Sequence, residues 1–545
     1  MKIPTFLQTK FALCTFSSLL FWLAWQLTPF FVLIAFVPLL WVENQLRRAS
    51  TRYKTIKTWF WAYYTLWAFN LYTTGWIAWG IFYGAGIELV YGAAFAIFVN
   101  AWLMTFPFMF FSFFNRKAHN LLAYFSFVFF WTCFEYLHLN WDLSWSWLNL
   151  GNAFAYAPWA IQWYEYTGSL GGTFWIVLVN VLIFLWIYRK TPKYRNASLI
   201  AITLPLLVSL FIWFTYEEKG RNTEIVVVQP NIDPYTQKFV DTKHFIPFHE
   251  QAEIFIRLAK QKMTTKTQLV ALPETAIDDY MEEKLIQSEV PFYPAIDKFK
   301  QFIKQNPEAN LLTGITSFTR FNSPKEASPY VTYGNGLGWY EVYNTALFLA
   351  EGKMPAFYHK SKLVPGVEAL PFPEFFKLFG DVMLKLGGTS GGVAKQKERT
   401  VFLGNNGIAY APLICYESVF GDFTNEYVRK GANVLVIITN DAWWGNSSGH
   451  KQHFHYARLR AIETRRAVAQ SANTGISGFI DQKGNILQQS KYWVQTALRA
   501  TLKANTKNTF YTQFGDWVGI GASYFALLFI LILIFLPKKQ NKANY

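Results

Sequence analysis

Long apolar stretches are the feature that most limits how this chain can fold. Eight of them approach or exceed the roughly 20 mostly apolar residues that a helix needs to cross a bilayer. They lie near residues 11–28, 30–46, 58–80, 90–114, 120–140, 169–188, 198–216 and 517–537. The sequence therefore predicts a polytopic α-helical membrane domain with eight spans.

The composition agrees with this prediction, because only 15% of the residues are charged, while 52% are hydrophobic. Soluble domains carry about 25% charged residues. The first apolar stretch follows Lys2 and Lys10 and lacks a small-residue cleavage site, so we expect an uncleaved signal-anchor.

The positive charge of the chain is placed beside the apolar stretches. The net charge of +16 comes largely from short basic clusters, which contain Arg47, Arg48, Arg52, Lys54, Lys57, Arg116, Lys117, Arg189, Lys190, Lys193, Arg195, Lys538, Lys539 and Lys542. The alternate loops, 81–89 and 141–168, contain no Lys or Arg. This asymmetry predicts cytoplasmic termini and places residues 217–516 on the opposite face, which is the periplasm in a bacterium. It argues against nucleic acid as the partner.

Residues 217–516 have a different pattern. Short apolar runs that end in polar residues predict buried strands: "EIVVVQPNI", "QLVALPET", "NLLTGIT", "TALFLAEG", "IAYAPLICYE", "NVLVIITND" and "ISGFIDQKGNIL". Helical patterns at 247–262, 294–305 and 449–469 lie between them, so we expect a layered α/β domain. The predicted organisation is a membrane domain at 1–216, a catalytic domain at 217–516, and an eighth helix with a basic tail at 517–545.

Three predicted strand ends carry reactive groups, namely Glu274, Lys360 and Cys415. Chemistry in open α/β sheets collects beyond the carboxyl ends of strands. Cys14 and Cys133 lie inside apolar stretches, so Cys415 has no evident disulfide partner. Taken singly, these residues are ordinary, since a lone thiol after an apolar run is usually inert and buried. An acid, an amine and a thiol together form a plausible catalytic set.

The motifs around these residues resemble the carbon–nitrogen hydrolase (nitrilase) superfamily. They are "LPET", "YHKSKLVP" and "CYE", in this order and spacing. The resemblance implies an α-β-β-α sandwich in which Glu274 is the general base, Lys360 stabilises the oxyanion and Cys415 is the nucleophile. A domain of this kind between a seventh and an eighth span resembles the apolipoprotein N-acyltransferase family.

That narrower resemblance implies an activity. A fatty acyl chain would pass from a phospholipid to a thioester on the cysteine, and then to the N-terminal α-amine of a diacylglyceryl-cysteine lipoprotein. It implies a monomeric enzyme of the bacterial inner membrane without a cofactor or metal. Supporting or substrate-binding residues would be Asn344, Glu368, Tyr416, Glu417 and Trp443. The glycine before Glu368 stands one position earlier than in the family pattern, which leaves the detailed role of Glu368 open.

An apolar segment at 372–386, "FPEFFKLFGDVMLKL", precedes "GGTSGG". Its large apolar residues predict either a membrane-dipping lid on a glycine hinge or an amphipathic helix packed on its own domain. These residues are Phe375, Phe376, Leu378, Phe379, Met383 and Leu386.

Two other functions remain as alternatives. A membrane-anchored amidase acting on small amides would use the same three residues, and a transporter or scaffold would not need them. The histidines at 450, 453 and 455 do not share one helix face, so we interpret them as structural or surface residues rather than metal ligands. The nearby Arg458, Arg460, Arg465 and Arg466 are expected to support a helix near the site or the lipid surface.

Overall fold

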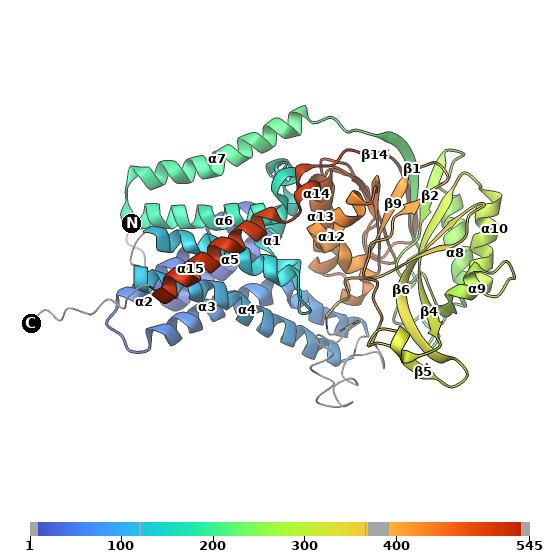
Figure 1. Cartoon of the computed structure of the whole chain (residues 1–545), viewed down its shortest axis with the longest axis horizontal. Helices are drawn as coiled ribbons and strands as arrows, with labels where there is room; N and C mark the ends of the chain where they lie inside the picture. Colours follow the sequence, from blue (N-terminus) through green and yellow to red (C-terminus); the bar gives the residue numbers. More distant parts are fainter. Residues whose placement is uncertain (1–8, 85, 119–120, 366, 369–391, 536–545) are drawn as a thin grey trace, which may run out of the picture. The chain divides into compact units, whose positions relative to one another are not determined.

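The computed structural model describes residues 9–84, 86–118, 121–365, 367–368 and 392–535. The chain divides into two compact units, which are described separately (Figure 1). One comprises residues 1–78, 90–215 and 514–545, and the other comprises residues 79–89 and 216–513. The short segment 79–89 therefore belongs to the second unit, although helices of the first unit flank it in the sequence.

The first unit is helical. Its α-helices are α1 (Lys10–Gln26), α2 (Val37–Arg48), α3 (Lys54–Thr74), α4 (Glu88–Ala118), α5 (Leu121–Leu139), α6 (Tyr164–Arg189), α7 (Pro192–Thr215) and α15 (Trp517–Phe535). Short 3₁₀ helices include η2 (Pro29–Leu33), η4 (Ser146–Leu148), η5 (Leu150–Tyr156) and η6 (Pro158–Ala160). Helical structure satisfies the backbone hydrogen bonds inside each segment, as a lipid environment requires.

Helices occupy all eight predicted apolar stretches, but only six described segments are long and apolar enough to cross a membrane. The exceptions are α1, which has 17 residues, and α3, whose Tyr, Trp and Thr residues lower its hydropathy. These segments make the chain a membrane protein.

Buried polar side chains connect helices of this unit. Glu135 on α5 accepts hydrogen bonds from Trp131 Nε1 at 2.8 Å and from the Leu150 N–H at 2.9 Å, and its second oxygen accepts from Thr173 Oγ1 at 2.5 Å. Every oxygen of this carboxylate is thus paired, as a buried polar group requires.

The second unit contains two β-sheets. One has the order β14-β1-β2-β4-β6-β5, with β3 paired to β4 and β7 paired to β6. Its strands are β1 (Arg221–Gln229), β2 (Thr267–Ala271), β3 (Ile277–Glu282), β4 (Asn310–Phe321), β5 (Thr332–Gly334), β6 (Gly338–Ala350), β7 (Ala356–His359) and β14 (Thr496–Ala504).

The other sheet has the order β13-β12-β11-β10-β9-β8. Its strands are β8 (Phe402–Leu403), β9 (Ala409–Ile414), β10 (Val434–Thr439), β11 (Ala467–Ala472), β12 (Gly478–Ile480) and β13 (Ile486–Gln489). The strands β9, β10 and β11 are parallel, so their carboxyl ends meet at one edge.

Helices cover each sheet on one side. The helices α8 (Phe248–Lys260) and α10 (Pro294–Gln305) contact the first sheet, and α12 (Gly421–Arg429) and α13 (Ser448–Thr464) contact the second (Figure 1). Between α8, α10 and the first sheet lies an apolar core that includes Phe255, Val270 and Phe299. The predicted layered α/β domain is therefore confirmed.

One predicted element is wrong in part. The helix expected at 449–469 ends at Thr464, and residues Ala467–Ala472 form strand β11 instead. Arg465 has a left-handed backbone (φ 50°), which stops the helix, and β11 then pairs in parallel with β10. The run "AVAQSA" alternates too weakly for its strand character to be visible in the sequence.

Candidate active site

Glu274 lies in the turn that follows β2. Its side chain is buried, and the next residue, Thr275, has a left-handed backbone with φ 43°. Gly314 on β4 makes room for this turn, because a Cβ there would lie 2.4 Å from the Thr275 nitrogen and 2.6 Å from the Glu274 Cα. A glycine is therefore needed where β4 passes the carboxylate.

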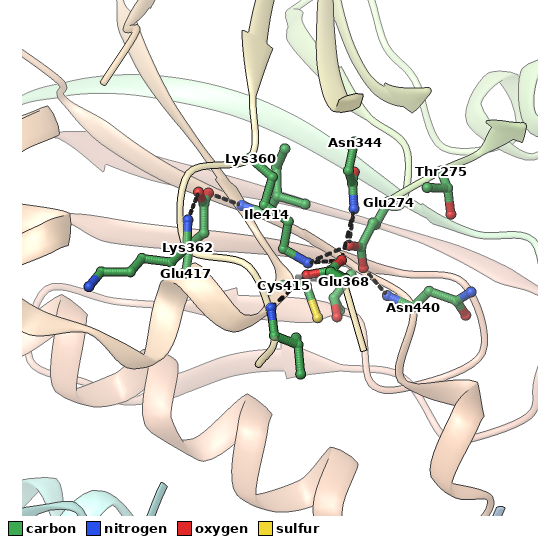
Figure 2. Close-up of polar contacts among 12 residues, drawn as sticks. Glu274, Thr275, Asn344, Lys360, Lys362, Glu368, Ile414, Cys415, Glu417 and Asn440 are labelled. Carbon is green, nitrogen blue, oxygen red and sulfur yellow. Dashed lines mark hydrogen bonds and ion pairs between the residues drawn. The ribbon is translucent and has the colours of Figure 1, made fainter. Parts of the chain in front are cut away.

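Lys360 follows β7 and points toward Glu274 (Figure 2). Its backbone N–H donates to the Asn344 carbonyl at 2.8 Å. Its Nζ donates to Glu274 Oε1 at 3.0 Å and to Glu368 Oε1 at 2.7 Å, and the residue is only 1% exposed. Burial opposes the charged form, but the two carboxylates outweigh it and raise the pKa of Lys360 well above its ordinary value.

Two further groups hold the Glu274 carboxylate in place. Asn344 on β6 donates from Nδ2 to Glu274 Oε1 at 2.8 Å, and also to Glu368 Oε1 at 3.4 Å. The Asn440 N–H, which follows β10, donates to Glu274 Oε2 at 3.1 Å. Both oxygens of Glu274 are thus oriented by donors from different strands.

Cys415 follows β9, and its backbone is left-handed with φ 51°. This conformation costs energy for a residue other than glycine and is typical of functional sites. The sulfur lies beside Lys360 and the carboxylate of Glu274 (Figure 2). Burial, with a contribution from Glu274, raises the pKa of the Cys415 thiol well above its ordinary value, although Lys360 acts in the opposite direction.

Glu417 joins the loop after Lys360 to the turn of Cys415. One carboxylate oxygen accepts from the Tyr358 hydroxyl at 2.7 Å and from the backbone N–H groups of Ser361 at 2.6 Å and Lys362 at 3.3 Å. The other accepts from the Ile414 N–H at 2.8 Å. Glu417 is fully buried, so its carboxylate pins two loops rather than facing solvent.

The other residues predicted for the site are Tyr416, Trp443 and those of the lid. Tyr416 is buried, and its ring packs edge-on against Phe420 with centroids 5.0 Å apart. Trp443 is 37% exposed, and its ring stacks on Phe239 with centroids 6.0 Å apart. Among the described residues, no hydrogen bond joins Trp443 to Glu274, Lys360 or Cys415. The predicted lid residues Phe375, Phe376, Leu378, Phe379, Met383 and Leu386 lie outside the described residues.

Sequence reasoning missed a second lysine at the site. Lys238, which is buried, donates from Nζ to the Thr275 hydroxyl at 3.0 Å and approaches the Glu274 carbonyl at 3.4 Å. Burial lowers its pKa to about 8, although Asp278 and Glu274 oppose the shift. Lys238 stands in an irregular segment without a motif, so no pattern in the sequence pointed to it.

Sequence reasoning also set aside His453, which is 1% exposed and contacts the turn of Cys415. Arg460 and Arg466 are buried too and donate to the carbonyls of Val419 at 2.6 Å and Ala432 at 2.8 Å. In the part of the chain that the structure describes, no group of three or more His, Cys, Asp or Glu residues is arranged to hold a metal ion.

Comparison with known proteins identifies the family of this site. The carbon-nitrogen hydrolase family model matches residues 225–509, which is more than half of the chain. The chain belongs to the carbon–nitrogen hydrolase family. The carbon–nitrogen hydrolase region contains every residue of the cluster around Glu274. A model of the apolipoprotein N-acyltransferase N-terminal domain matches residues 17–182.

Named relatives match most of the chain. The apolipoprotein N-acyltransferase of Chlorobaculum tepidum is 29% identical over 441 residues, covering 78% of this chain and 80% of that protein. The apolipoprotein N-acyltransferase of Pasteurella multocida is 27% identical over 483 residues, which cover 87% of this chain and 86% of that protein. A similar solved structure is the crystal structure of Saccharomyces cerevisiae Nit3, a member of branch 10 of the nitrilase superfamily. Its sequence is 16% identical, its TM-score is 0.36, and the match covers 53% of this chain and 92% of Nit3.

Proposed function

We propose that this protein transfers a fatty acyl chain from a phospholipid to the N-terminal α-amine of a diacylglyceryl-cysteine lipoprotein, with Cys415 as the covalent carrier. The observation that carries the proposal is the cluster of Glu274, Lys360 and Cys415 in a chain whose residues 17–182 match an apolipoprotein N-acyltransferase N-terminal domain. The relatives named above bear that same activity in their names.

In the first step, the Cys415 sulfur attacks the ester carbonyl of the phospholipid. The carbon–sulfur bond forms, and the thiol proton passes to Glu274. The bond from the carbonyl carbon to the glycerol oxygen then breaks, and that oxygen receives the proton from Glu274. A lysophospholipid leaves, and the acyl chain remains on Cys415 as a thioester.

In the second step, the lipoprotein amine attacks the thioester. Glu274 accepts a proton from the amine nitrogen as the carbon–nitrogen bond forms, and returns it to the departing sulfur. The amide product leaves, and the enzyme is regenerated without net proton change. One carboxylate thus serves both half-reactions. Because the lysophospholipid leaves before the amine reacts with the thioester, we expect ping-pong kinetics.

Lys360 is the proposed oxyanion donor. An ammonium has three N–H donors, and among the described residues Glu274 and Glu368 accept two of them. The third would serve the tetrahedral intermediate, together with the backbone N–H of Tyr416. Such preorganised donors supply a large share of acyl-transfer catalysis. Glu368 holds the lysine, and Glu417 keeps the loops that carry Lys360 and Cys415 together.

Lipid substrates give a reason for the membrane unit. Moving an acyl chain through water costs about 0.8 kcal/mol per exposed CH₂ group, so delivery from the bilayer avoids a large barrier. We propose that all eight helical segments span the membrane, that the termini are cytoplasmic, and that residues 217–516 form the catalytic domain on the periplasmic side. The enzyme would act as a monomer.

A direct test uses the purified full-length protein in detergent with a phospholipid that carries a radiolabelled acyl chain. We expect label on the protein that neutral hydroxylamine releases, and no such label on Cys415→Ala. Addition of a diacylglyceryl lipopeptide with a free N-terminus should move the label to the peptide, whereas an N-acetylated lipopeptide should not accept it. Label on Cys415→Ala would contradict the mechanism. Release of free fatty acid without transfer to the lipopeptide would favour a hydrolase.

A further inference from the structure

A buried histidine on α13 contacts the backbone of the proposed nucleophile. His453 Nε2 lies 3.1 Å from the Cys415 carbonyl oxygen and 2.9 Å from Ser418 Oγ. Its other nitrogen, Nδ1, lies 3.0 Å from Asp441 Oδ1. The imidazole therefore bridges the turn after β9 to the turn after β10.

The partners of the ring determine its protonation. The Asp441 carboxylate is an acceptor, so Nδ1 carries a proton. The Cys415 carbonyl is also an acceptor, and the Ser418 hydroxyl already donates to it at 2.8 Å. Nε2 thus faces two oxygen acceptors and carries a proton as well. This set of partners favours the protonated ring, an imidazolium paired with Asp441.

Asp441 connects this pair to the sulfur of Cys415. Its Oδ1 accepts from the Thr439 hydroxyl at 2.8 Å, and that hydroxyl also contacts the Cys415 side chain. Burial raises the pKa of Cys415, Asp441 adds to this effect, and the Thr439 hydroxyl lowers it. The hydroxyl has only one proton to donate, so Asp441 and a developing thiolate compete for it.

We propose that His453 is a positioning residue for the nucleophile: it holds the strained carbonyl of Cys415 and neutralises Asp441, so that Thr439 can donate to the sulfur as the thiol loses its proton. This inference rests on the proposed function, since it assumes that Cys415 is the reacting group. It assigns a role to a histidine outside the Glu–Lys–Cys set. The Asp441–His453 pair would then help to set how readily the Cys415 thiol loses its proton.

The groups around His453 are consistent with this role. Within the described part of the chain, Asp441, Cys415 and Glu274 act on His453 from other elements, and His450, one turn earlier on α13, also faces Asp441. Burial disfavours the charged ring, but Asp441 outweighs it and raises the pKa of His453 above its ordinary value. Burial lowers the pKa of His450 to about 4, so that ring is neutral and does not compete for Asp441.

The test measures the reactivity of Cys415 without any lipid. Purified full-length protein in detergent is treated with iodoacetamide over a range of pH, and the modification of the Cys415 peptide is followed by mass spectrometry. In His453→Gln, Asp441 is left uncompensated beside the sulfur. We expect the alkylation midpoint to move to higher pH by about one unit, so that the rate near neutral pH falls about tenfold.

A second variant separates electrostatics from simple structural damage. The double variant Asp441→Asn with His453→Gln removes both charges, and we expect its alkylation profile to return toward that of the wild type. Thr439→Val, which is nearly isosteric, should slow alkylation while the thermal midpoint of the protein changes little. His455→Gln is the matched control, because His455 lies on the same helix with Nδ1 3.0 Å from Arg458 Nη1, and its profile should match the wild type.

The inference fails if His453→Gln keeps the wild-type profile, or if the double variant is as slow as the single one. If His453→Gln does not fold, a wild-type profile in Thr439→Val overturns it instead. These outcomes are distinct from failure of the proposed function. A wild-type protein that forms no acyl-thioester, yet shows the expected shifts in alkylation, would refute acyl transfer and leave the positioning role intact.

Discussion

At the scale of single residues, the proposed chemistry depends on which groups around Cys415 hold protons. Its thiol is kept protonated at rest by burial and by the nearby Glu274 carboxylate. A preformed thiolate would be open to oxidation and to metals. A thiol that loses its proton only to a positioned base reacts when the substrate is in place. Glu274, fixed at both oxygens, is suited to be that base.

This view predicts the effect of Glu274→Gln, which preserves the size of the side chain but cannot accept the proton. We expect acyl-thioester formation to fall by about 10²–10⁴-fold, the usual contribution of a general base. Single-turnover labelling with a phospholipid measures the rate. Glu308→Gln, at an exposed position in the same unit, is the control and should be unaffected. Labelling of Glu274→Gln at the wild-type rate would assign proton transfer to another group.

Lys238 gives a prediction about pH and stability. Its folded pKa of about 8 lies below the ordinary value of 10.5, so the unfolded chain binds this proton more tightly. The stability that depends on this group is fully present above about pH 10.5 and is lost as the pH falls through about 8. We therefore expect the thermal midpoint of the wild type, relative to Lys238→Met, to rise over that interval. Differential scanning fluorimetry in detergent measures it, and parallel curves would contradict the burial of a charged lysine.

The sequence predicts the reactive residues better than their supports. Glu274, Lys360 and Cys415 end apolar runs and carry recognisable motifs, so they could be proposed as the reactive set before the structure. Lys238 and Asn440 act through a loop amine and a backbone N–H, which no pattern of side chains reveals. His453 was visible in the sequence, but its importance comes from the carbonyl and the carboxylate that folding brings to it.

At the scale of elements, most strands follow from short apolar runs, whereas the course of the chain between them does not. The run that ends at Cys415 is strand β9, and the run before Asn440 is β10, as expected. The strand β11 was hidden, because Arg465 ends α13 in a left-handed conformation that its residue type does not favour. Pairing with β10 therefore outweighs the weak strand preference of residues Ala467–Ala472.

The close approach of β4 to the Glu274 turn yields a prediction at this scale. Gly314→Ala would place a methyl group against backbone atoms of Glu274 and Thr275, which cannot move aside as a flexible side chain can. We expect a loss of about 1–3 kcal/mol of stability, together with reduced thioester formation because the carboxylate shifts. Gly92→Ala is the control, since a Cβ there meets nothing within 4 Å. A Gly314→Ala protein with wild-type melting and activity would show that the turn is freer than the contacts indicate.

At the scale of the whole molecule, one chain combines two compact units that are encoded in different ways. Long apolar stretches specify the helical unit, and short apolar runs with polar ends specify the layered α/β unit. The segment 79–89 belongs to the second unit although helices of the first flank it in the sequence. The Asn446 N–H donates to the Tyr83 hydroxyl at 3.3 Å, and a Cβ at Gly80 would lie 2.3 Å from the Trp443 carbonyl. The lack of Lys and Arg in 81–89 predicts only the side of the membrane on which this loop lies, and not these contacts.

The charge asymmetry of the loops predicts on which side each part lies. Single cysteines at Glu308 and Thr51, both exposed, would probe the α/β unit and a basic loop. We expect a membrane-impermeant maleimide to label Glu308→Cys in intact spheroplasts, and Thr51→Cys only after the membrane is permeabilised. The reverse pattern would place the α/β unit in the cytoplasm and would contradict the proposed orientation.

The carboxylate of Glu274 comes from one sheet, and the thiol of Cys415 comes from the other. During synthesis the base and the amine emerge from the ribosome well before the thiol, and neither early piece has a partner to activate. In the proposed mechanism, catalytic competence therefore arrives late and all at once, when folding of both sheets brings Glu274 and Cys415 together. We therefore expect a nascent or misassembled chain not to react with the lipids around it, so that turnover reports correct assembly.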